Sequence, residues 1–187
     1  MLIKARAQAK LPTTKYGNFA CTAYKIGGHD YACVTCGDVT TGNPFVRIQS
    51  GCVYATVFHS ADCDCRQEID DALRVIAGAQ HGVFVYAPHK EGRGVDLVTK
   101  TLAMANRQET GCDSAEDLSA IGLESNDFRG YDEEVAILRD LQVSRQIRLL
   151  SCNDGKRQAV EKGGFTVTQE YCFAKPSHTW QPSTASA

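Results

Sequence analysis

The 187-residue chain lacks three features that mark other classes of protein. Its formal net charge of −2 provides no basic excess with which to bind nucleic acid broadly. No apolar run approaches the roughly 20 residues that a bilayer-spanning helix needs. The N-terminal segment, residues 1–6, lacks the apolar block of a secretory signal. We therefore expect a cytoplasmic protein that binds neither nucleic acid nor membranes.

Cysteine, in contrast, is abundant, with nine residues. In an unexported chain these are expected to be metal ligands and buried thiols rather than disulfides. Cys52, a ten-residue spacer and Cys63-Asp64-Cys65 together place three thiols where they can converge on one soft ion. Thiolates select zinc or iron–sulfur over hard cations, and three protein ligands leave one position for water, as in catalytic zinc sites. The alternative is that these are simply buried thiols.

Two other features compete with this interpretation of the cysteines. Cys33 and Cys36 form a second pair, but they fall in a strand-like run, where residues three apart point to opposite faces. We therefore expect that pair to belong to the core. His59 lies between the first and second expected ligands and could close the zinc sphere, which would make the site structural.

The order of elements predicts an α+β fold. Runs rich in β-branched and aromatic residues, separated by turns, predict strands at 16–26, 31–37, 45–50, 83–86, 147–150 and 165–173. Apolar residues at helical spacing predict helices around 69–76, 94–110, 135–141 and 156–162. The sheet should be mixed, with N-terminal antiparallel strands and strand–helix alternation in the second half. We expect one domain over 1–175 and a disordered tail over 176–187.

Three short motifs carry candidate binding and catalytic groups. Glu91-Gly92-Arg93-Gly94 follows a buried strand and opens a helix, a position that favours anions, although an ordinary charged turn has the same sequence character. Asp127 and Arg129 lie two residues apart, and such pairs are most often surface ion pairs. Lys156 is a candidate phosphate anchor, or a solvated lysine at a helix start.

In order and spacing these motifs resemble the GTP cyclohydrolase II family, over nearly the whole chain from Lys10 to about Tyr171. The residues that carry the resemblance are Arg47-Ile48-Gln49-Ser50-Gly51-Cys52, Cys63-Asp64-Cys65, Glu91-Gly92-Arg93-Gly94, Asp127-x-Arg129 and Ile147-Arg148-Leu149-Leu150-Ser151. The resemblance implies a homodimer that opens the imidazole ring of GTP, releases formate and pyrophosphate, and feeds riboflavin synthesis.

The resemblance also implies a role for each matching residue. Cys52, Cys63 and Cys65 match the zinc ligands, and magnesium is expected on the triphosphate. Arg129 matches a residue proposed to attack the α-phosphate, with Asp127 as its proton acceptor, although charge stabilisation by Arg129 explains the same pairing. The nucleotide-contacting positions are Arg47, Ser50, Glu68, Glu91, Gly92, Arg93, Ser114, Ser151 and Lys156.

Four positions depart from the family pattern. Gln49 and Gly51 stand where the family reads His and Glu, and Glu68 stands where it usually reads Gln, so the base preference of the pocket is open. Met104 replaces a tyrosine whose hydroxyl serves the hydrolytic chemistry, and a thioether cannot donate a proton. We hypothesise that ring opening survives while deformylation is lost. The alternative is that Met104 only packs and another group or water supplies the proton.

Two other functions stay open at this point. The chain could hydrolyse another purine nucleotide in a specialised pathway, which a substrate panel would reveal. It could also be a non-catalytic, zinc-stabilised nucleotide-binding module, in which case replacing His59 should strip the metal.

Overall fold

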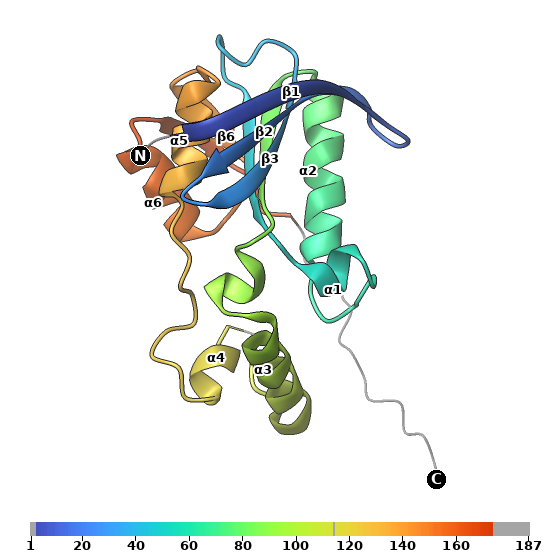
Figure 1. Ribbon diagram of the computed structural model, residues 1–187, viewed down its shortest axis with the longest axis vertical. Coiled ribbons are helices and arrows are strands. Elements are labelled where there is room, and N and C mark those ends of the chain that lie inside the picture. Colours follow the sequence, from blue (N-terminus) through green and yellow to red (C-terminus); the bar gives the residue numbers. More distant parts are fainter. Residues whose placement is uncertain (1–2, 114, 174–187) are drawn as a thin grey trace.

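The computed structural model describes residues 3–113 and 115–173 and contains one seven-stranded mixed sheet with helices around it (Figure 1). The strands are β1 (Ile3–Thr13), β2 (Gly17–Ile26), β3 (His29–Cys36), β4 (Phe45–Ser50), β5 (Gly82–Ala87), β6 (Gln146–Leu149) and β7 (Thr166–Glu170). The helices are α1 (Val53–Thr56), α2 (Cys65–Ala79), α3 (Leu97–Thr110), α4 (Asp117–Ala120), α5 (Asp132–Asp140) and α6 (Asp154–Lys162), with a 3₁₀ turn, η1 (Glu91–Gly94). The expected tail at 176–187 lies outside the described residues.

The sheet has an antiparallel half and a parallel half. The strand order is β1-β2-β3-β5-β4-β6-β7. Pairing is antiparallel from β1 to β5 and parallel from β5 through β4 and β6 to β7. The predicted mixed sheet, with N-terminal antiparallel strands and later strand–helix alternation, is confirmed. Because β4, β5 and β6 run in the same direction, their carboxyl ends meet at one edge, where parallel sheets place ligands.

Helices cover both faces of the sheet at its central strands, β4 and β5. In Figure 1, α5 and α6 lie on one side of it and α2 on the other. Val83 and Val85 of β5 belong to the core under α5 and α6, whereas Phe84 belongs to the core under α2. Burial on both faces explains why this strand has a continuous apolar sequence. Cys33 and Cys36 likewise fall in opposite cores, as expected for residues three apart in a strand.

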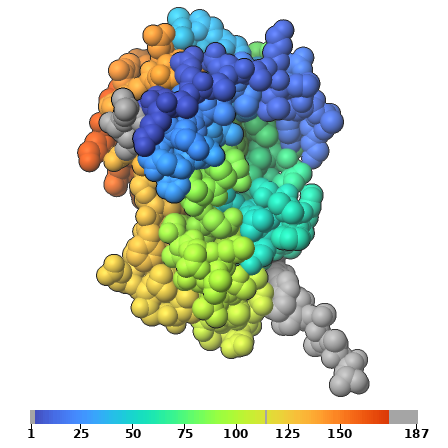
Figure 2. Space-filling view, in the orientation of Figure 1, coloured from blue at the N-terminus to red at the C-terminus, as the bar shows by residue number. Residues whose placement is uncertain are grey.

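Helices α3 and α4 lie beyond the strand ends rather than on the sheet, in the lower part of Figures 1 and 2. A buried ion pair ties the chain before η1 to the start of α5: Lys90 Nζ donates to the Gly130 carbonyl at 2.5 Å and to Glu134 at 2.6 Å. Glu134 is fully buried. Within the described ranges, no helix has the length and apolar character needed to cross a bilayer.

Strand β1 is the main element that the sequence pattern does not indicate. Its side chains are exposed at nine of eleven positions and include lysine, arginine and glutamine, so it shows no alternation of apolar and polar residues. It forms because its backbone pairs with β2 along almost its whole length. At the other edge of the sheet, β7 ends at Glu170, three residues before the expected strand end. The backbone amide of Tyr171 still bonds the Leu149 carbonyl at 2.9 Å.

Candidate active site

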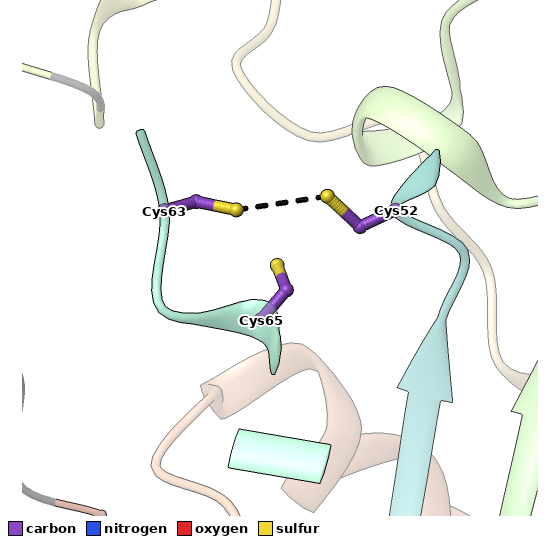
Figure 3. A group of neighbouring side chains, drawn as sticks. All are labelled: Cys52, Cys63 and Cys65. Atoms are coloured by element: carbon purple, nitrogen blue, oxygen red, sulfur yellow. Dashed lines mark hydrogen bonds between the residues drawn. The ribbon is translucent and has the colours of Figure 1, made fainter. Parts of the chain in front are cut away.

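Three cysteine sulfurs converge where β4 ends and α2 begins. Cys52 follows β4, whereas Cys63 precedes α2 and Cys65 is the first residue of that helix. All three Sγ atoms lie within 4.8 Å of one another, and those of Cys52 and Cys63 are 3.6 Å apart. Figure 3 shows the three side chains pointing toward a common centre. The structure thus contains a possible three-cysteine metal site.

The protonation of the three thiols indicates that this cluster suits a cation. Hydrogen bonds from Cys63 and Cys65 lower the pKa of Cys52, while hydrogen bonding to Cys52 raises the pKa of Cys63 and of Cys65. Three neighbouring thiolates repel one another, so the group carries its full charge only around a positive ion. A soft, tetrahedral divalent ion such as zinc matches sulfur donors at this spacing.

His59 is not part of the cluster. Among the described residues, no histidine or carboxylate joins the three cysteines. His59 is exposed, and its φ of 55° places it in the left-handed region. The donor set is therefore three sulfurs, which leaves room in a tetrahedral sphere for a further ligand.

Lys100 of α3 is a neighbour of the cluster that sequence reasoning did not single out. Its Nζ donates to the Cys52 sulfur at 3.3 Å and to the Glu91 carboxylate, and it lies 5.0 Å from the centroid of the Tyr54 ring. Burial would lower the pKa of Lys100, but the hydrogen bond to Glu91 and the charge of Cys52 outweigh it and raise the pKa. The sequence held one signal for this placement: Lys100 is four residues before Met104 and so shares its helix face.

The sulfurs open onto a cavity of about 410 Å³. Met104, Gly92 and Arg93 line this cavity together with the three cysteines. Both Gly92 and Arg93 have positive φ values, 54° and 60°. A Cβ at position 92 would press on the stem of Lys100, which explains the glycine, whereas Arg93 holds a conformation that is unusual for a side chain of its size.

A chain of ion pairs crosses the α3–α4 side of this cavity. Asp117 is buried and accepts from Arg93 at 3.0 Å and from Arg107 at 2.9 Å. Arg107 also pairs with Asp62, in the loop just before Cys63. Sequence reasoning missed these carboxylates, because nothing in the short α4 segment indicates that Asp117 faces inward. The network joins η1, α3 and α4 to the loop that carries Asp62 and Cys63.

A second cavity of about 360 Å³ adjoins the first and is lined by Arg47, Ser151 and Lys156. Arg47 is 2% exposed, and its guanidinium donates to the Gln49 side chain at 2.9 and 2.5 Å, to the Leu150 carbonyl at 2.7 Å and to Glu68 at 2.7 Å. The carboxylate of Glu68, which lines both cavities, is thus bound to a buried cation.

Gly51 cannot be replaced by a larger residue in this backbone. A Cβ there would collide with the carbonyl oxygen of Pro88, the residue after β5. A side chain at position 51, such as the glutamate expected from the family pattern, therefore requires a different path for the chain around Pro88.

Asp127 and Arg129 form a tight ion pair, in which Arg129 lines both cavities. The Arg129 guanidinium donates to Asp127 at 2.8 and 2.6 Å and to the Ser50 hydroxyl at 3.2 Å. Burial would lower the pKa of Arg129, but the hydrogen bond to Asp127 outweighs it and raises the pKa. Partial burial likewise opposes, without cancelling, the lowering of the Asp127 pKa by Arg129. Arg129 therefore stays charged.

Lys156 lines both cavities from the first turn of α6. Its side chain is buried, and none of the ion pairs among the described residues includes it, although the charge of Glu68 acts on it. Burial, with the positive charges of Arg47 and Arg129, lowers the pKa of Lys156 to about 7. The group is a buried cation aimed at a polar cavity, an arrangement that suits an anionic ligand.

The structure brings most of the predicted residues to these two cavities. Glu91 and Asp127 are exceptions, because neither is among the described residues that line the two cavities. Each of these carboxylates is instead bound to a neighbouring cation, Glu91 to Lys100 and Asp127 to Arg129. Ser114 lies outside the described residues. The predicted lining residues are Arg47, Ser50, Glu68, Gly92, Arg93, Arg129, Ser151, Lys156 and the three cysteines.

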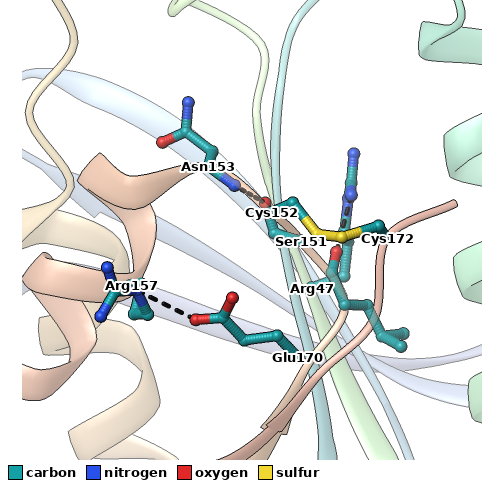
Figure 4. The surroundings of a disulfide bond; sticks show 8 residues. Arg47, Ser151, Cys152, Asn153, Arg157, Glu170 and Cys172 are labelled. Carbon is teal, nitrogen blue, oxygen red and sulfur yellow. Dashed lines mark hydrogen bonds and ion pairs between the residues drawn. A yellow bond between two sulfur atoms is a disulfide. The ribbon is translucent and has the colours of Figure 1, made fainter.

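The expectation that the cysteines form no disulfide is wrong for one pair. Cys152 and Cys172 are disulfide-bonded, with Cα atoms 5.3 Å apart (Figure 4). Both line the second cavity, and Cys152 adjoins Ser151. The expectation came from the presumed reducing compartment, and the sequence alone does not show that the segment after β7 returns beside the loop after β6. Phe173 follows, with its ring 5.7 Å from the Arg47 guanidinium.

Comparison with known proteins places this site in context. Residues 4–172 match the family described as GTP cyclohydrolase II. A GTP cyclohydrolase-2 from Archaeoglobus fulgidus is 35% identical over 175 residues, which are 94% of this chain and 46% of the relative. A riboflavin biosynthesis protein RibBA from Salinispora tropica is 36% identical over 176 residues, 92% of this chain and 43% of the relative. The chain therefore spans less than half the length of these two relatives.

A relative of more similar length is the GTP cyclohydrolase-2 of Streptomyces coelicolor. It is 36% identical over 162 residues, which are 86% of this chain and 72% of the relative. Among solved structures, a two-domain 3,4-dihydroxy-2-butanone 4-phosphate synthase from A. baumannii matches with a TM-score of 0.49 and 18% identity. The match spans 93% of this chain and 41% of the chain in that structure. That structural likeness is too weak to bear on fold or function.

Proposed function

The chain belongs to the GTP cyclohydrolase II family, and from that premise we propose that it opens the imidazole ring of GTP hydrolytically and releases pyrophosphate. The observation that carries the proposal is the three-sulfur cluster, which opens onto a cavity lined with cations. One water opens the ring between C8 and N9, and a second cleaves the bond between the α- and β-phosphates. The product is a formylamino-pyrimidinone ribosylamine 5′-phosphate.

Zinc is the metal we assign to the site, held by Cys52, Cys63 and Cys65. When bound, it supplies a Lewis acid that lowers the pKa of a coordinated water toward about 7. The protein's own contribution is to place the purine of the substrate against this cluster. The size of the adjoining cavity supports that placement, since a volume of about 410 Å³ is in the range of small-molecule sites.

The triphosphate is proposed to lie toward the second cavity. Arg47, Ser151 and Lys156 line that space. Most cations of the site already have a carboxylate partner, as Arg47 has Glu68 and Arg129 has Asp127. The protein therefore offers little excess positive charge to a triphosphate, and Mg²⁺ on the phosphates would supply it.

We infer that Arg129 stabilises charge rather than attacking phosphorus. A guanidinium that donates two hydrogen bonds to Asp127, and whose pKa is raised, has no free lone pair to act as a nucleophile. Its Nη1 faces the Ser50 hydroxyl beside the first cavity. From there it can bind a phosphate oxygen as negative charge develops during the cleavage of the anhydride.

Met104 sets the proposed product. It lines the cavity beside the cysteines, on the face of α3 that also carries Lys100. A thioether offers no proton to the leaving amine in the hydrolysis of the formamide, so we propose that the formylamino compound accumulates without formate.

One observation favours the alternative product, in which formate is released. The Tyr54 hydroxyl bonds the Thr101 hydroxyl at 2.7 Å, and Tyr54 lines the same cavity. Thr101 is one helical turn before Met104, so the Tyr54 hydroxyl lies near the missing group. Tyr54 could therefore supply the proton.

The deciding experiment incubates the purified protein with GTP, zinc and magnesium and quantifies formate, pyrophosphate and the nucleotide product by mass spectrometry. We expect pyrophosphate and the formylamino product, and expect Met104→Tyr to add formate release. Gln108→Tyr is the matched control, because it adds a tyrosine to the same helix at an exposed position that lines neither cavity. Stoichiometric formate from the wild type would refute the proposed product, and loss of that formate in Tyr54→Phe would identify its source.

The same assay separates the other candidates. Turnover of a different purine nucleotide but not of GTP would indicate a specialised hydrolase. Metal and nucleotide binding without any turnover would indicate a binding module. We also propose a homodimer, which exposed apolar side chains at Phe58, Val98 and Leu102 support. A monomeric mass in sedimentation equilibrium would contradict it.

A further inference from the structure

We propose that Lys100 is a positioning residue for the metal centre: it donates a charge-assisted hydrogen bond to the Cys52 sulfur and so weakens electron donation from that sulfur to the metal. The inference rests on the proposed zinc site and adds a residue outside the ligand set to it. Glu91, predicted as a nucleotide contact, is assigned instead to hold Lys100.

Glu91 holds Lys100 in contact with the Cys52 sulfur. Lys100 Nζ lies 3.3 Å from Cys52 Sγ, and its side chain is 20% exposed. The Glu91 carboxylate accepts from this ammonium with one oxygen, and with the other it accepts from the backbone amide of Val53 at 2.7 Å. Val53 is the residue after Cys52. One carboxylate thus fixes the ammonium and the chain that carries the sulfur, and the Tyr54 ring covers the ammonium on another side.

The need for such a donor follows from charge. Catalytic zinc sites commonly carry three histidines, two histidines and a carboxylate, or two cysteines and a histidine, so the ion and its ligands have a net charge between +2 and 0. Three thiolates leave a net charge of −1, which makes the ion a poorer Lewis acid. A hydrogen bond to a ligating sulfur withdraws electron density from it, and neighbours of this kind are known to tune metal sites.

Glu91 does not cancel this effect, although its charge is opposite to that of Lys100. Polarisation of a sulfur depends on the donor hydrogen that touches it, and the carboxylate acts on Lys100 by orienting that hydrogen. If Lys100 only held α3 and η1 together, its ion pair with Glu91 would be sufficient. The contact with Cys52 is the additional feature, and it is the one to be tested.

The test uses cobalt as a spectroscopic substitute for zinc, so it requires no turnover. The absorption band for charge transfer from sulfur to cobalt reports electron donation by the thiolates. Lys100→Met removes the donor and keeps the side-chain length, and we expect the band to shift to lower energy. We also expect kcat/KM to fall roughly 10- to 100-fold, because without the donor the sulfur gives more electron density to the metal and makes it a poorer Lewis acid.

Three further variants make the result specific. Lys100→Arg keeps a charged donor and should retain the wild-type band, whereas Lys100→Gln keeps a neutral donor and should give an intermediate shift. Lys162→Met makes the same change at an exposed position on α6 and should leave the spectrum unchanged. Circular dichroism confirms folding of each variant, and Lys100→Gln carries the test if Lys100→Met does not fold.

The outcomes separate this inference from the proposed function. An unchanged band in both Lys100→Met and Lys100→Gln would overturn the role of Lys100 while leaving the metal site intact. A wild-type protein that binds neither cobalt nor zinc would overturn both proposals together. A shift in Lys100→Met that Lys100→Arg reverses is the result that supports the hydrogen bond.

Discussion

Replacing the buried Lys156 by methionine should stabilise the protein, and more so at low pH. Lys156 is 6% exposed, and burial lowers its pKa from the ordinary 10.5 to about 7. Between these two values the unfolded chain holds a proton on this lysine that the native protein does not. The unfolded state therefore binds more protons in that window, and the free energy of unfolding rises with pH. Below about pH 7 both states are protonated, and the native state carries the whole penalty.

The size of the effect follows from the shift. A change of about 3.5 units, at about 1.36 kcal/mol per unit, predicts that the charged lysine destabilises the native state by about 4 to 5 kcal/mol at pH 6. By pH 9 most native molecules hold neutral lysine, and the penalty falls to about 2 kcal/mol. Methionine keeps the apolar stem and removes the charge. Its advantage over lysine should shrink by about 2 to 3 kcal/mol between pH 6 and pH 9.

Urea denaturation of both proteins at pH 6 and pH 9, with equal metal content and the disulfide intact, measures this difference. Taking the difference between variants at each pH cancels the titration of all other groups. Lys162→Met, at an exposed position, is the control and should change stability by less than about 0.5 kcal/mol. The reasoning is refuted if Lys156→Met is less stable than the wild type at pH 6, or if its advantage is the same at both pH values.

Two other predictions concern the same loop. Cys152→Ser removes a cross-link between residues 20 apart in sequence, and loop-closure entropy predicts that the free energy of unfolding falls by about 3 kcal/mol. Urea denaturation measures this loss, and reduced wild-type protein should be as stable as the variant. Equal stability of the reduced and oxidised wild type would contradict this account. In the activity assay, kcat/KM should fall as pH rises through about 7, because free enzyme then loses the ammonium of Lys156 that binds phosphate. Lys156→Arg should move that fall to higher pH, and an unchanged profile would exclude Lys156 as its source.

The elements that were predictable from sequence are those whose side chains are buried in a regular pattern. Strand β5 is apolar at successive positions because both faces of the sheet are covered, and α2 shows helical spacing because one side of it packs on the sheet. Strand β1 was not predictable, since its side chains face solvent and only its backbone bonds hold it in place. Propensity and periodicity carry no signal for such a strand.

The same distinction applies to the site. Asp127 and Arg129 are two residues apart, so their ion pair could be anticipated from local sequence, and the short spacer makes the cysteine cluster predictable as well. The contact of Lys100 with Cys52 joins residues 48 apart, and it depends on the path of α3 beyond the sheet edge. No spacing rule encodes that path.

The loop after β6 combines two opposing contributions to stability, and their sizes are comparable. Lys156 destabilises the native state by about 4 to 5 kcal/mol at pH 6, while the cross-link at Cys152, four residues earlier, contributes about 3 kcal/mol. A buried cation without an ion pair gains nothing for folding, so its presence is explained by an anionic ligand that restores the lost solvation. Such a loop would tend to open and hydrate its lysine. The disulfide, anchored at Cys172 on the segment after β7, opposes that opening and keeps the ammonium facing the cavity. Charge and cross-link together therefore favour a preorganised phosphate site over a more stable but inert loop.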